Sequence, residues 1–505
     1  MVFHSFEFIL VFLPLAYLGF LTAYRLAGWT GAFRFLIVAS LVFYAQWSVA
    51  FAVILAISIA ANYQLGQAIM ARAEAPDRGW GLLLVGIAAN IVALGYFKYS
   101  NFLIDIANGL TGSGFQHIRL LLPVGISFYT FVQIGYLVEA YNGSVQRPSP
   151  DRYALFCAFF PCVTAGPLVL QREMLEQMDD RRDAAFDATR LAVGLTMFGI
   201  GLFKKVFLAD SIAPFSDAVF DGAGAGSGLT PSIAWLGSVS YALQLYFDFS
   251  GYSDMALGLG LIFGLKLPLN FDSPFKACSI SEFWRRWHVT MTRFFTTYVF
   301  TPLAMRGMRS AGGRKAGRLE RFALTGGIPA LATFLVAGVW HGAGWTFVVY
   351  GLLHGTAIAV NLGWREARLP SLPPAVGWLL TMSVVVTGLV IFRAPSLELA
   401  GSILGCMWVP FLMQPTDAAS LVAIDQRLAL ATIVLLGAIV LLMPNSQQIL
   451  HRYWVSSDVM PATARVAAGL VSWRPSLGLA FGLAATLTIA IASIGAGTTF
   501  VYYQF

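Results

Sequence analysis

Charged residues are scarce in this sequence of 505 residues. Asp, Glu, Lys and Arg together make up 11% of it and hydrophobic residues 58%, whereas a soluble globular protein carries about 25% charged residues. Such a composition excludes a soluble protein and predicts one that is embedded in a membrane. The net charge of +7 is then expected to reflect basic cytoplasmic loops. No basic soluble face is visible, so we expect no binding of nucleic acid.

Cysteine and histidine are scarce as well. The cysteines show no metal-ligand spacing and three of them lie in apolar runs, so we expect interior residues and no metal site; the four are Cys157, Cys162, Cys278 and Cys406. The whole chain contains six histidines. A histidine inside an apolar segment therefore stands out as a candidate for function.

The N-terminal segment holds a long apolar run with no Lys or Arg before it and no small-residue cleavage site. These features indicate a first transmembrane helix rather than a signal peptide. The first basic residues, Arg25 and Arg34, follow the run. Because basic residues gather on the cytoplasmic side of a membrane, we expect a periplasmic N-terminus.

Long apolar runs recur along the rest of the chain. A membrane span needs about 20 apolar residues, and the runs predict an all-α polytopic protein with about 11–14 transmembrane and re-entrant helices. The candidate segments are 6–24, 33–48, 49–70, 80–97, 119–141, 152–170, 188–209, 231–248, 252–266, 322–340, 344–363, 375–393, 398–414, 427–443 and 476–496. In 152–170, the stretch FFPCVTAGPLVL is interrupted by Pro and Gly. Such a break is tolerated at membrane depth only inside protein or beside a cavity.

Two polar stretches interrupt the apolar pattern. Residues 171–190 are expected to form a solvated helix or loop. Residues 279–321 are strongly basic, since nine Lys and Arg face only Glu282 and Glu320. We therefore place 279–321 at the cytoplasmic face. The nine basic residues are Arg285, Arg286, Arg293, Arg306, Arg309, Arg314, Lys315, Arg318 and Arg321.

The sequence SISEFWRRWHVTMTRFFTTY, 279–298, predicts an amphipathic helix. Ser279 followed by Glu282 fits a capping box at its start. On such a helix Trp284 and His288 share a face, and Glu282 can pair with Arg286. A plain membrane-surface helix is one interpretation. The other is a site reached from the cytoplasm, where two arginines steer an anionic substrate; its candidate residues are Trp284, Arg285, Arg286, Trp287 and His288.

The sequence GVWHGAGW, 338–345, places Trp340 and His341 at the end of an apolar run. Counted from Pro329, which can start a helix, His341 lies about 18 Å along the axis, well inside the membrane. Residues 342–344 are small and leave room for backbone or substrate. An imidazole with a pKa near neutrality can act as a general base toward a hydroxyl. The alternative is a core histidine whose nitrogens are bonded by neighbours.

Other polar residues lie in apolar segments. The candidates for lining or positioning a site are Asp248, Ser250 and Asp254 in LYFDFSGYSDMALG, Ser127 and Gln133 in LPVGISFYTFVQ, and His354 in GLLHG. We expect Gly251 to break the helix between the two aspartates. Structural pairing is the alternative for the aspartates, and hydrogen bonding between helices is the alternative for Gln133. His354 could support His341 or be a core histidine.

Several of these motifs together resemble the membrane-bound O-acyltransferase family. They are SISEFWRRWH, GVWHGAGWTFVVYGLLHG, LYFDFSGYSDMALG, NFDSPF, LPVGISFYTF and FFPCVTAGPL, and they span residues 122–355. The resemblance is strongest to the bacterial branch that includes the membrane subunit of alginate O-acetylation and the D-alanyl transfer protein of teichoic acid modification. Jointly the motifs are specific, whereas each alone would be weak.

The resemblance implies a ring of helices around a central funnel and tunnel. It also implies one integral membrane domain over 1–505, with a core at about 122–363 and additional helices at about 375–505. The implied activity is transfer of an acyl group to a hydroxyl, with His341 as the essential histidine and His288 as the second.

By the same resemblance, the acyl donor is acetyl-CoA used from the cytoplasm, and no tightly bound cofactor is expected. The expected partners are a polysaccharide acceptor, a periplasmic or membrane-anchored acetyltransferase, and the lipid bilayer of a bacterial inner membrane. Two rival interpretations stay open. One is D-alanyl transfer from a carrier protein to a cell-envelope polymer. The other is a small-molecule transporter, which broken helices and buried carboxylates would also suit.

Overall fold

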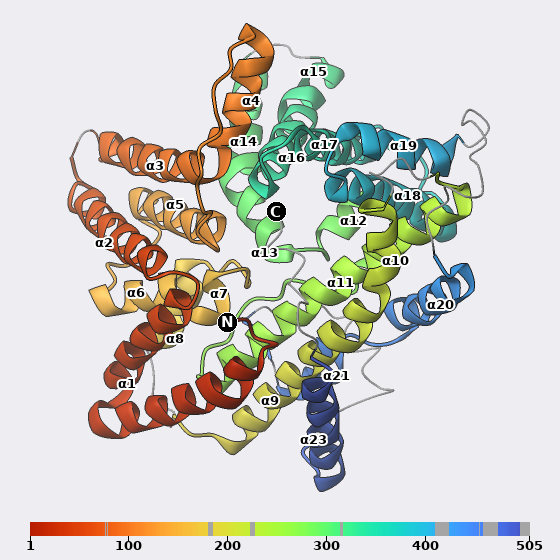
Figure 1. Cartoon of the computed structure of the whole chain (residues 1–505). Helices are drawn as coiled ribbons and strands as arrows, with labels where there is room; N and C mark the ends of the chain where they lie inside the picture. Colours follow the sequence, from red (N-terminus) through yellow and green to blue (C-terminus); the bar gives the residue numbers. More distant parts are fainter. Residues whose placement is uncertain are drawn as a thin grey trace. The chain divides into compact units, whose positions relative to one another are not determined.

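The computed structural model describes residues 1–75, 77, 79–179, 185–222, 228–313, 317–409, 424–453, 455–457 and 473–494. Every regular element within these ranges is a helix, which confirms the predicted all-α class (Figure 1). The chain divides into two compact units. Unit 1 comprises Met1–Phe203, Tyr252–Leu269 and Ser446–Gly497, and unit 2 comprises Lys204–Gly251, Asn270–Asn445 and Thr498–Phe505.

Unit 1 contains the N-terminal helices and a short C-terminal group. Its elements are η1 (Glu7–Phe12), α1 (Leu13–Ala45), α2 (Val49–Ala71), α3 (Trp80–Leu94), η2 (Gly95–Tyr99), α4 (Ser100–Thr111), α5 (Ile126–Asn142), α6 (Pro150–Ala158), α7 (Phe160–Val163), α8 (Gln171–Asp179), α9 (Ala188–Phe203), α21 (Ser446–Ile449), η10 (His451–Tyr453) and α23 (Leu477–Ala492). Helix α5 packs against α2 and α3 (Figure 1).

Unit 2 contains the middle of the chain. Its elements are η3 (Lys204–Ala209), α10 (Asp210–Phe220), most of α11 (Pro231–Ile262), η5 (Pro274–Lys276), α12 (Ile280–Trp284), α13 (Val289–Phe295), η6 (Thr296–Phe300), α14 (Thr301–Gly312), α15 (Arg318–Phe322), η7 (Ala323–Gly327), α16 (Ile328–His341), α17 (Trp345–Glu366), α18 (Pro374–Arg393), α19 (Leu397–Trp408) and α20 (Gln426–Leu442). Helices α16, α17 and α18 pack in sequence (Figure 1).

Seven helical segments of the described chain are long and apolar enough to cross a membrane. They are Glu7–Ala45, Val49–Ala71, Trp80–Thr111, Ala188–Phe220, Arg318–His341, Trp345–Glu366 and Pro374–Arg393, and shorter apolar helices occur at Leu397–Trp408, Gln426–Leu442 and Leu477–Ala492. The prediction of a multi-pass membrane protein is confirmed.

The first of these segments is folded back on itself. Helical geometry breaks at Ala27 and at Gly28, whose φ is +62°, a backbone conformation that suits glycine. The two halves then approach closely, because a Cβ on Gly19 would lie 2.2 Å from the ring of Phe35. The segment therefore behaves as the two spans, 6–24 and 33–48, that the sequence predicts.

The sequence predicts two helix breaks, and the structure confirms one of them and contradicts the other. The predicted break between Asp248 and Asp254 is wrong, since α11 runs without interruption through Gly251. The predicted break in 152–170 is confirmed, because α6 ends at Ala158 and a separate short helix, α7, follows. Phe159 and Phe160 at this junction are fully buried, as expected for irregular backbone shielded by protein.

Glycines hold α16 and α17 close together. A Cβ on Gly338 would lie 2.3 Å from the carbonyl oxygen of Phe347, and a Cβ on Gly351 would lie 2.4 Å from that of Phe334. Only residues without a side chain permit such contact between backbones. This packing fixes the end of α16, where His341 lies, against the start of α17.

Candidate functional site

The start of the basic segment folds as its sequence predicts. The Ser279 hydroxyl accepts a hydrogen bond from the backbone N–H of Glu282 at 3.2 Å, and α12 begins at the next residue. Glu282 pairs with Arg286 at 2.8 Å. The capping residue and the predicted ion pair are both confirmed.

The helix does not continue to residue 298, so this part of the prediction is wrong. It ends at Trp284, and His288 adopts left-handed geometry with φ 43° before α13 begins. The intervening backbone pairs with an extended segment instead, through Asp272 N to Arg286 O and Val289 N to Asn270 O, both 2.9 Å. Trp284 and His288 therefore do not share a helical face.

His288 is 1% exposed and is held by Asn270. Its Nδ1 lies 3.2 Å from Asn270 Oδ1, which also accepts a hydrogen bond from Thr290 Oγ1 at 2.6 Å. Because an amide oxygen only accepts, this contact favours the tautomer with the proton on Nδ1 and makes Nε2 the basic nitrogen. Burial lowers the pKa of His288 from 6.5 to about 3, so the ring is neutral at physiological pH.

His341 ends α16 and is 7% exposed. Aromatic rings surround it, with centroid distances of 5.2 Å to Phe392 and 6.0 Å to Tyr350. The helix that carries it begins at Arg318, before Pro329, so counting from Pro329 understates its length. At 1.5 Å per residue, Arg318–His341 spans about 36 Å. His341 therefore lies at the end of a helix of membrane length, and its depth in the membrane stays a prediction.

The indole of Trp340 lies close to both candidate histidines. Its centroid is 6.2 Å from that of His288 and 4.9 Å from that of His341. The structure thus brings together two motifs that are separated by about fifty residues in the sequence. We call the group of His288, Trp340, His341, Tyr350 and His354 the imidazole cluster.

His354 is 1% exposed and closely enclosed. The indole N–H of Trp284 donates to its Nδ1 at 3.3 Å. Since an indole can only donate, Nδ1 is the acceptor and the ring proton is on Nε2. A Cβ on Gly388 would lie 2.4 Å from Nε2, so α18 covers this side. These contacts support a core or positioning role for His354 and leave little room for a substrate.

The remaining candidates of the basic segment differ in their surroundings. Trp287 is buried against Phe271, Phe275 and Phe283. Arg286 is occupied by Glu282 and lies 4.0 Å from Asp272. Arg285 is exposed and has no ion-pair partner among the described residues. Of the two arginines, Arg285 is therefore the one open to an anionic ligand. Arg314 and Lys315 of the same basic segment lie outside the described residues.

Asp248 is paired with a lysine that the sequence reading did not single out. Lys205 Nζ lies 2.8 Å from Asp248 Oδ1 and 2.8 Å from Asp210 Oδ1. Asp248 is 0% exposed, so the lysine compensates a charge that would otherwise be costly to bury. Ser250 on the same helix is also buried, at 1% exposure. The positive charge in a span, Lys205, is a signal that sequence reasoning could have used.

Three other candidates belong to unit 1. Asp254 accepts hydrogen bonds from Ser446 Oγ at 2.7 Å and Gln447 Nε2 at 3.3 Å. Ser127 lies 3.4 Å from the Nζ of Lys98, a lysine in a span that the sequence reading also missed.

Gln133 joins helices, as one of the two interpretations predicts. Its Oε1 accepts from Ser58 Oγ at 2.8 Å and from Asn62 Nδ2, and Asn90 Nδ2 donates to Asn62 Oδ1 at 2.7 Å. These residues come from α2, α3 and α5. We call Ser58, Asn62, Asn90 and Gln133 the amide network.

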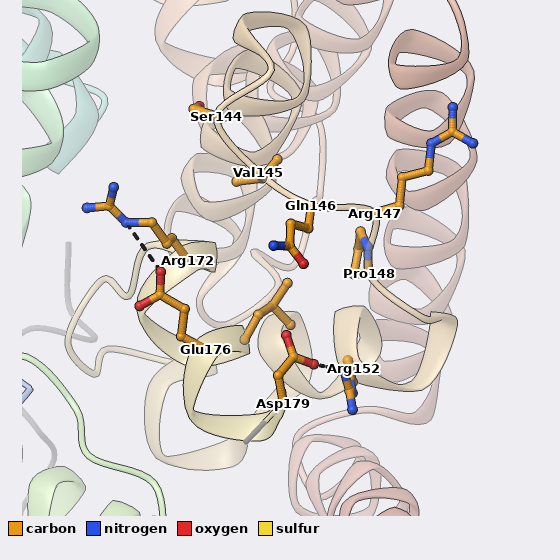
Figure 2. Close-up of a pocket in the computed structure, with 10 residues that line it drawn as sticks. Ser144, Val145, Gln146, Arg147, Pro148, Arg152, Arg172, Glu176 and Asp179 are labelled. Atoms are coloured by element: carbon orange, nitrogen blue, oxygen red, sulfur yellow. Dashed lines mark ion pairs between the residues drawn. The ribbon is translucent and has the colours of Figure 1, made fainter. Parts of the chain in front are cut away.

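A cavity of about 370 Å³ lies in unit 1 between the α5–α6 loop, α6 and α8 (Figure 2). It contains none of the candidates named above, and its two carboxylates are taken by arginines. Arg152 pairs with Asp179, and Arg172 lies 3.9 Å from Glu176. Within the described ranges no three His, Cys, Asp or Glu side chains are grouped as metal ligands.

Comparison with known proteins adds to this geometry. A sequence model described as the membrane-bound O-acyltransferase family matches residues 77–404, more than half of the chain. The chain belongs to the membrane-bound O-acyltransferase family. The resemblance inferred from the motifs is confirmed, and so is the predicted enzyme class, an O-acyltransferase.

Individual relatives agree with this assignment. The chain is 39% identical over 428 residues to the peptidoglycan O-acetyltransferase of Helicobacter pylori, covering 79% of this chain and 78% of that protein. It is 37% identical over 407 residues to a probable alginate O-acetylase AlgI of Pseudomonas aeruginosa, covering 79% and 73%. It is 28% identical over 295 residues to the teichoic acid D-alanyltransferase of Streptococcus thermophilus, covering 54% and 68%.

Proposed function

We propose that this membrane-bound O-acyltransferase moves an acetyl group from cytoplasmic acetyl-CoA to a hydroxyl of a cell-envelope polysaccharide, directly or through a periplasmic acetyltransferase partner. The observation that carries the proposal is that His288 and His341, which are distant in the sequence, both lie close to the indole of Trp340. The names of two relatives, a peptidoglycan O-acetyltransferase and a probable alginate O-acetylase, support a polysaccharide acceptor.

In this proposal His341 is the general base. It accepts the proton of the acceptor hydroxyl as the oxygen attacks the thioester carbonyl, a contribution of about 10² to 10⁴ in rate. His288 is neutral with Nε2 as its basic nitrogen, and it orients the second substrate. The exposed Arg285 attracts the phosphates of the donor at the cytoplasmic face.

The test is the release of free CoA from acetyl-CoA by the purified protein, with and without a polysaccharide fragment as acceptor. We expect release by the wild type and a loss of at least about 100-fold in His341→Ala. The matched control is His117→Ala, because His117 is exposed and is bonded to Asp105; its rate should equal that of the wild type. A His341→Ala protein that is folded and retains the wild-type rate would refute the proposal.

D-alanyl transfer is the second candidate, and the relative from Streptococcus thermophilus favours it. That match has lower identity and covers less of this chain than the O-acetyltransferase matches do. If the wild type releases no CoA, D-alanyl transfer from a loaded carrier protein is the next reaction to measure. Membership of an acyltransferase family favours either transfer reaction over transport.

A further inference from the structure

Tyr350 packs against two histidines of the imidazole cluster. Its ring centroid lies 6.0 Å from that of His341 and 4.6 Å from that of His354, and it meets both rings nearly edge-on or tilted. The ring of Phe392 also packs against Tyr350, with a centroid distance of 5.1 Å. The ring of Tyr350 is thus held firmly on α17, next to the histidine that we propose as the base.

The hydroxyl of Tyr350 makes no hydrogen bond with any residue that the structure describes. Buried tyrosine hydroxyls ordinarily find a partner. In this protein Tyr44 donates to the carbonyl oxygen of Val124 at 2.6 Å, and Tyr252 bonds Thr164 at 2.6 Å. Other buried tyrosine hydroxyls have no partner among the described residues, and Tyr350 differs from those in unit 1 by its place beside His341. Tyr350 therefore has hydrogen-bonding capacity in reserve for a ligand.

Two buried polar groups on α11 also lack hydrogen-bond partners among the described residues. The Tyr241 hydroxyl is fully buried and has no hydrogen-bond partner among the described residues, and neither does Gln244 Oε1. Buried polar atoms that are unsatisfied within the protein indicate that water or a polar ligand completes them. This region of unit 2 is therefore suited to a polar group and not only to lipid or hydrocarbon.

We propose that Tyr350 contacts the substrate, with its hydroxyl donating a hydrogen bond to the carbonyl oxygen of the acyl group undergoing transfer. This inference rests on the proposed function. His341 accepts the proton of the acceptor hydroxyl, and Tyr350 stabilises the negative charge that develops on the carbonyl oxygen. A fixed donor aimed at a developing oxyanion is among the strongest contributions to catalysis. His354, which packs against Tyr350, is then a positioning residue.

The step balances without any further reactant. The acceptor oxygen forms a bond to the thioester carbon while its proton passes to His341. The carbonyl oxygen carries the negative charge, bonded by Tyr350, until the carbon–sulfur bond breaks. The departing thiolate then takes the proton from His341. The products are an ester and free CoA, and Tyr350 stays protonated throughout.

The test is the steady-state rate of Tyr350→Phe in the full-length protein, measured as CoA release at saturating acetyl-CoA. Phe keeps the ring contacts and removes only the hydroxyl. We expect kcat to fall by about 10² to 10³, while KM for acetyl-CoA changes by no more than about threefold and the thermal midpoint is retained. The matched control is Tyr153→Phe, since Tyr153 is a fully buried tyrosine of unit 1 whose hydroxyl has no hydrogen-bond partner in the described chain.

Each outcome is decisive. A lower kcat with unchanged KM and unchanged thermal midpoint supports the inference. An active wild type whose kcat is the same in Tyr350→Phe overturns it and leaves the proposed function intact. A fall in kcat accompanied by a lower thermal midpoint, or matched by Tyr153→Phe, overturns it by indicating a structural role. An inactive wild type overturns the proposed function first.

Discussion

Two sets of buried polar groups, one in each unit, differ in chemical kind. The amide network of unit 1 consists of neutral side chains that bond one another across α2, α3 and α5. In unit 2 the set consists of titratable groups, the Lys205–Asp248–Asp210 cluster and three histidines below 8% exposure. Unit 1 also buries Asp254 and His4, so the contrast is between these two sets and not between all buried groups of the units. Neutral amides join helices at small energetic cost, whereas charged or basic groups are expensive to bury and persist where function needs them. We therefore assign the amide network to the packing of helices and the titratable groups of unit 2 to chemistry.

Removal of Lys205 should have the largest effect on stability. Lys205→Met leaves Asp248, which is 0% exposed, without its cation. We expect the free energy of unfolding to fall by about 3–5 kcal/mol, measured as thermal unfolding in detergent. The double variant Lys205→Met/Asp248→Asn removes both charges and should recover part of the loss. If the single variant is as stable as the wild type, the cluster does not stabilise unit 2.

Local sequence rules predicted some features of the candidate site. His341, His288 and Trp340 stand out in their motifs, and the structure brings them close together, while their roles stay predictions. The capping residue Ser279 and the pair Glu282–Arg286 depend on spacings of three and four residues. Short-range rules are enough for such features.

Features that depend on distant partners could not be predicted in the same way. The helix after Trp284 ends because backbone near Asn270 supplies hydrogen bonds that compete with those of a helix. The predicted break at Gly251 fails because packing overrides the low helix propensity of one glycine. Lys205 was visible as a charge in an apolar run, but its partner Asp248 lies 43 positions away. The hydrophobic periodicity of a sequence does not reveal pairs of residues that are so far apart along the chain.

The second prediction concerns pH. Burial lowers the pKa of His288 from 6.5 to about 3 in the folded protein, so as pH falls below about 6.5 the unfolded chain takes up a proton that the folded chain refuses. His288 should therefore contribute a loss of stability of about 1.4 kcal/mol per pH unit below pH 6.5, or about 2 kcal/mol at pH 5, in addition to the contribution of any other buried histidine. The measurement is thermal unfolding from pH 8 to pH 5. His288→Gln should make the pH dependence of stability shallower by this amount, and an unchanged slope in that variant would show that His288 does not contribute to it.

The smallest expected effect belongs to the amide network. Asn90 donates to Asn62 and to the carbonyl oxygen of Gly86, and bonds of this kind between membrane helices contribute about 0.6 kcal/mol each, with a maximum near 1.7. Asn90→Leu should therefore lower the free energy of unfolding by about 1 kcal/mol, equally at pH 8 and pH 5, because no member of the network titrates in this range. The control is Ile91→Leu, at a neighbouring exposed position, which should change neither stability nor acyl transfer. If Asn90→Leu abolished acyl transfer in a folded protein, the amide network would have a role in chemistry. The assignment of structural and chemical roles to the two sets of residues would then be wrong.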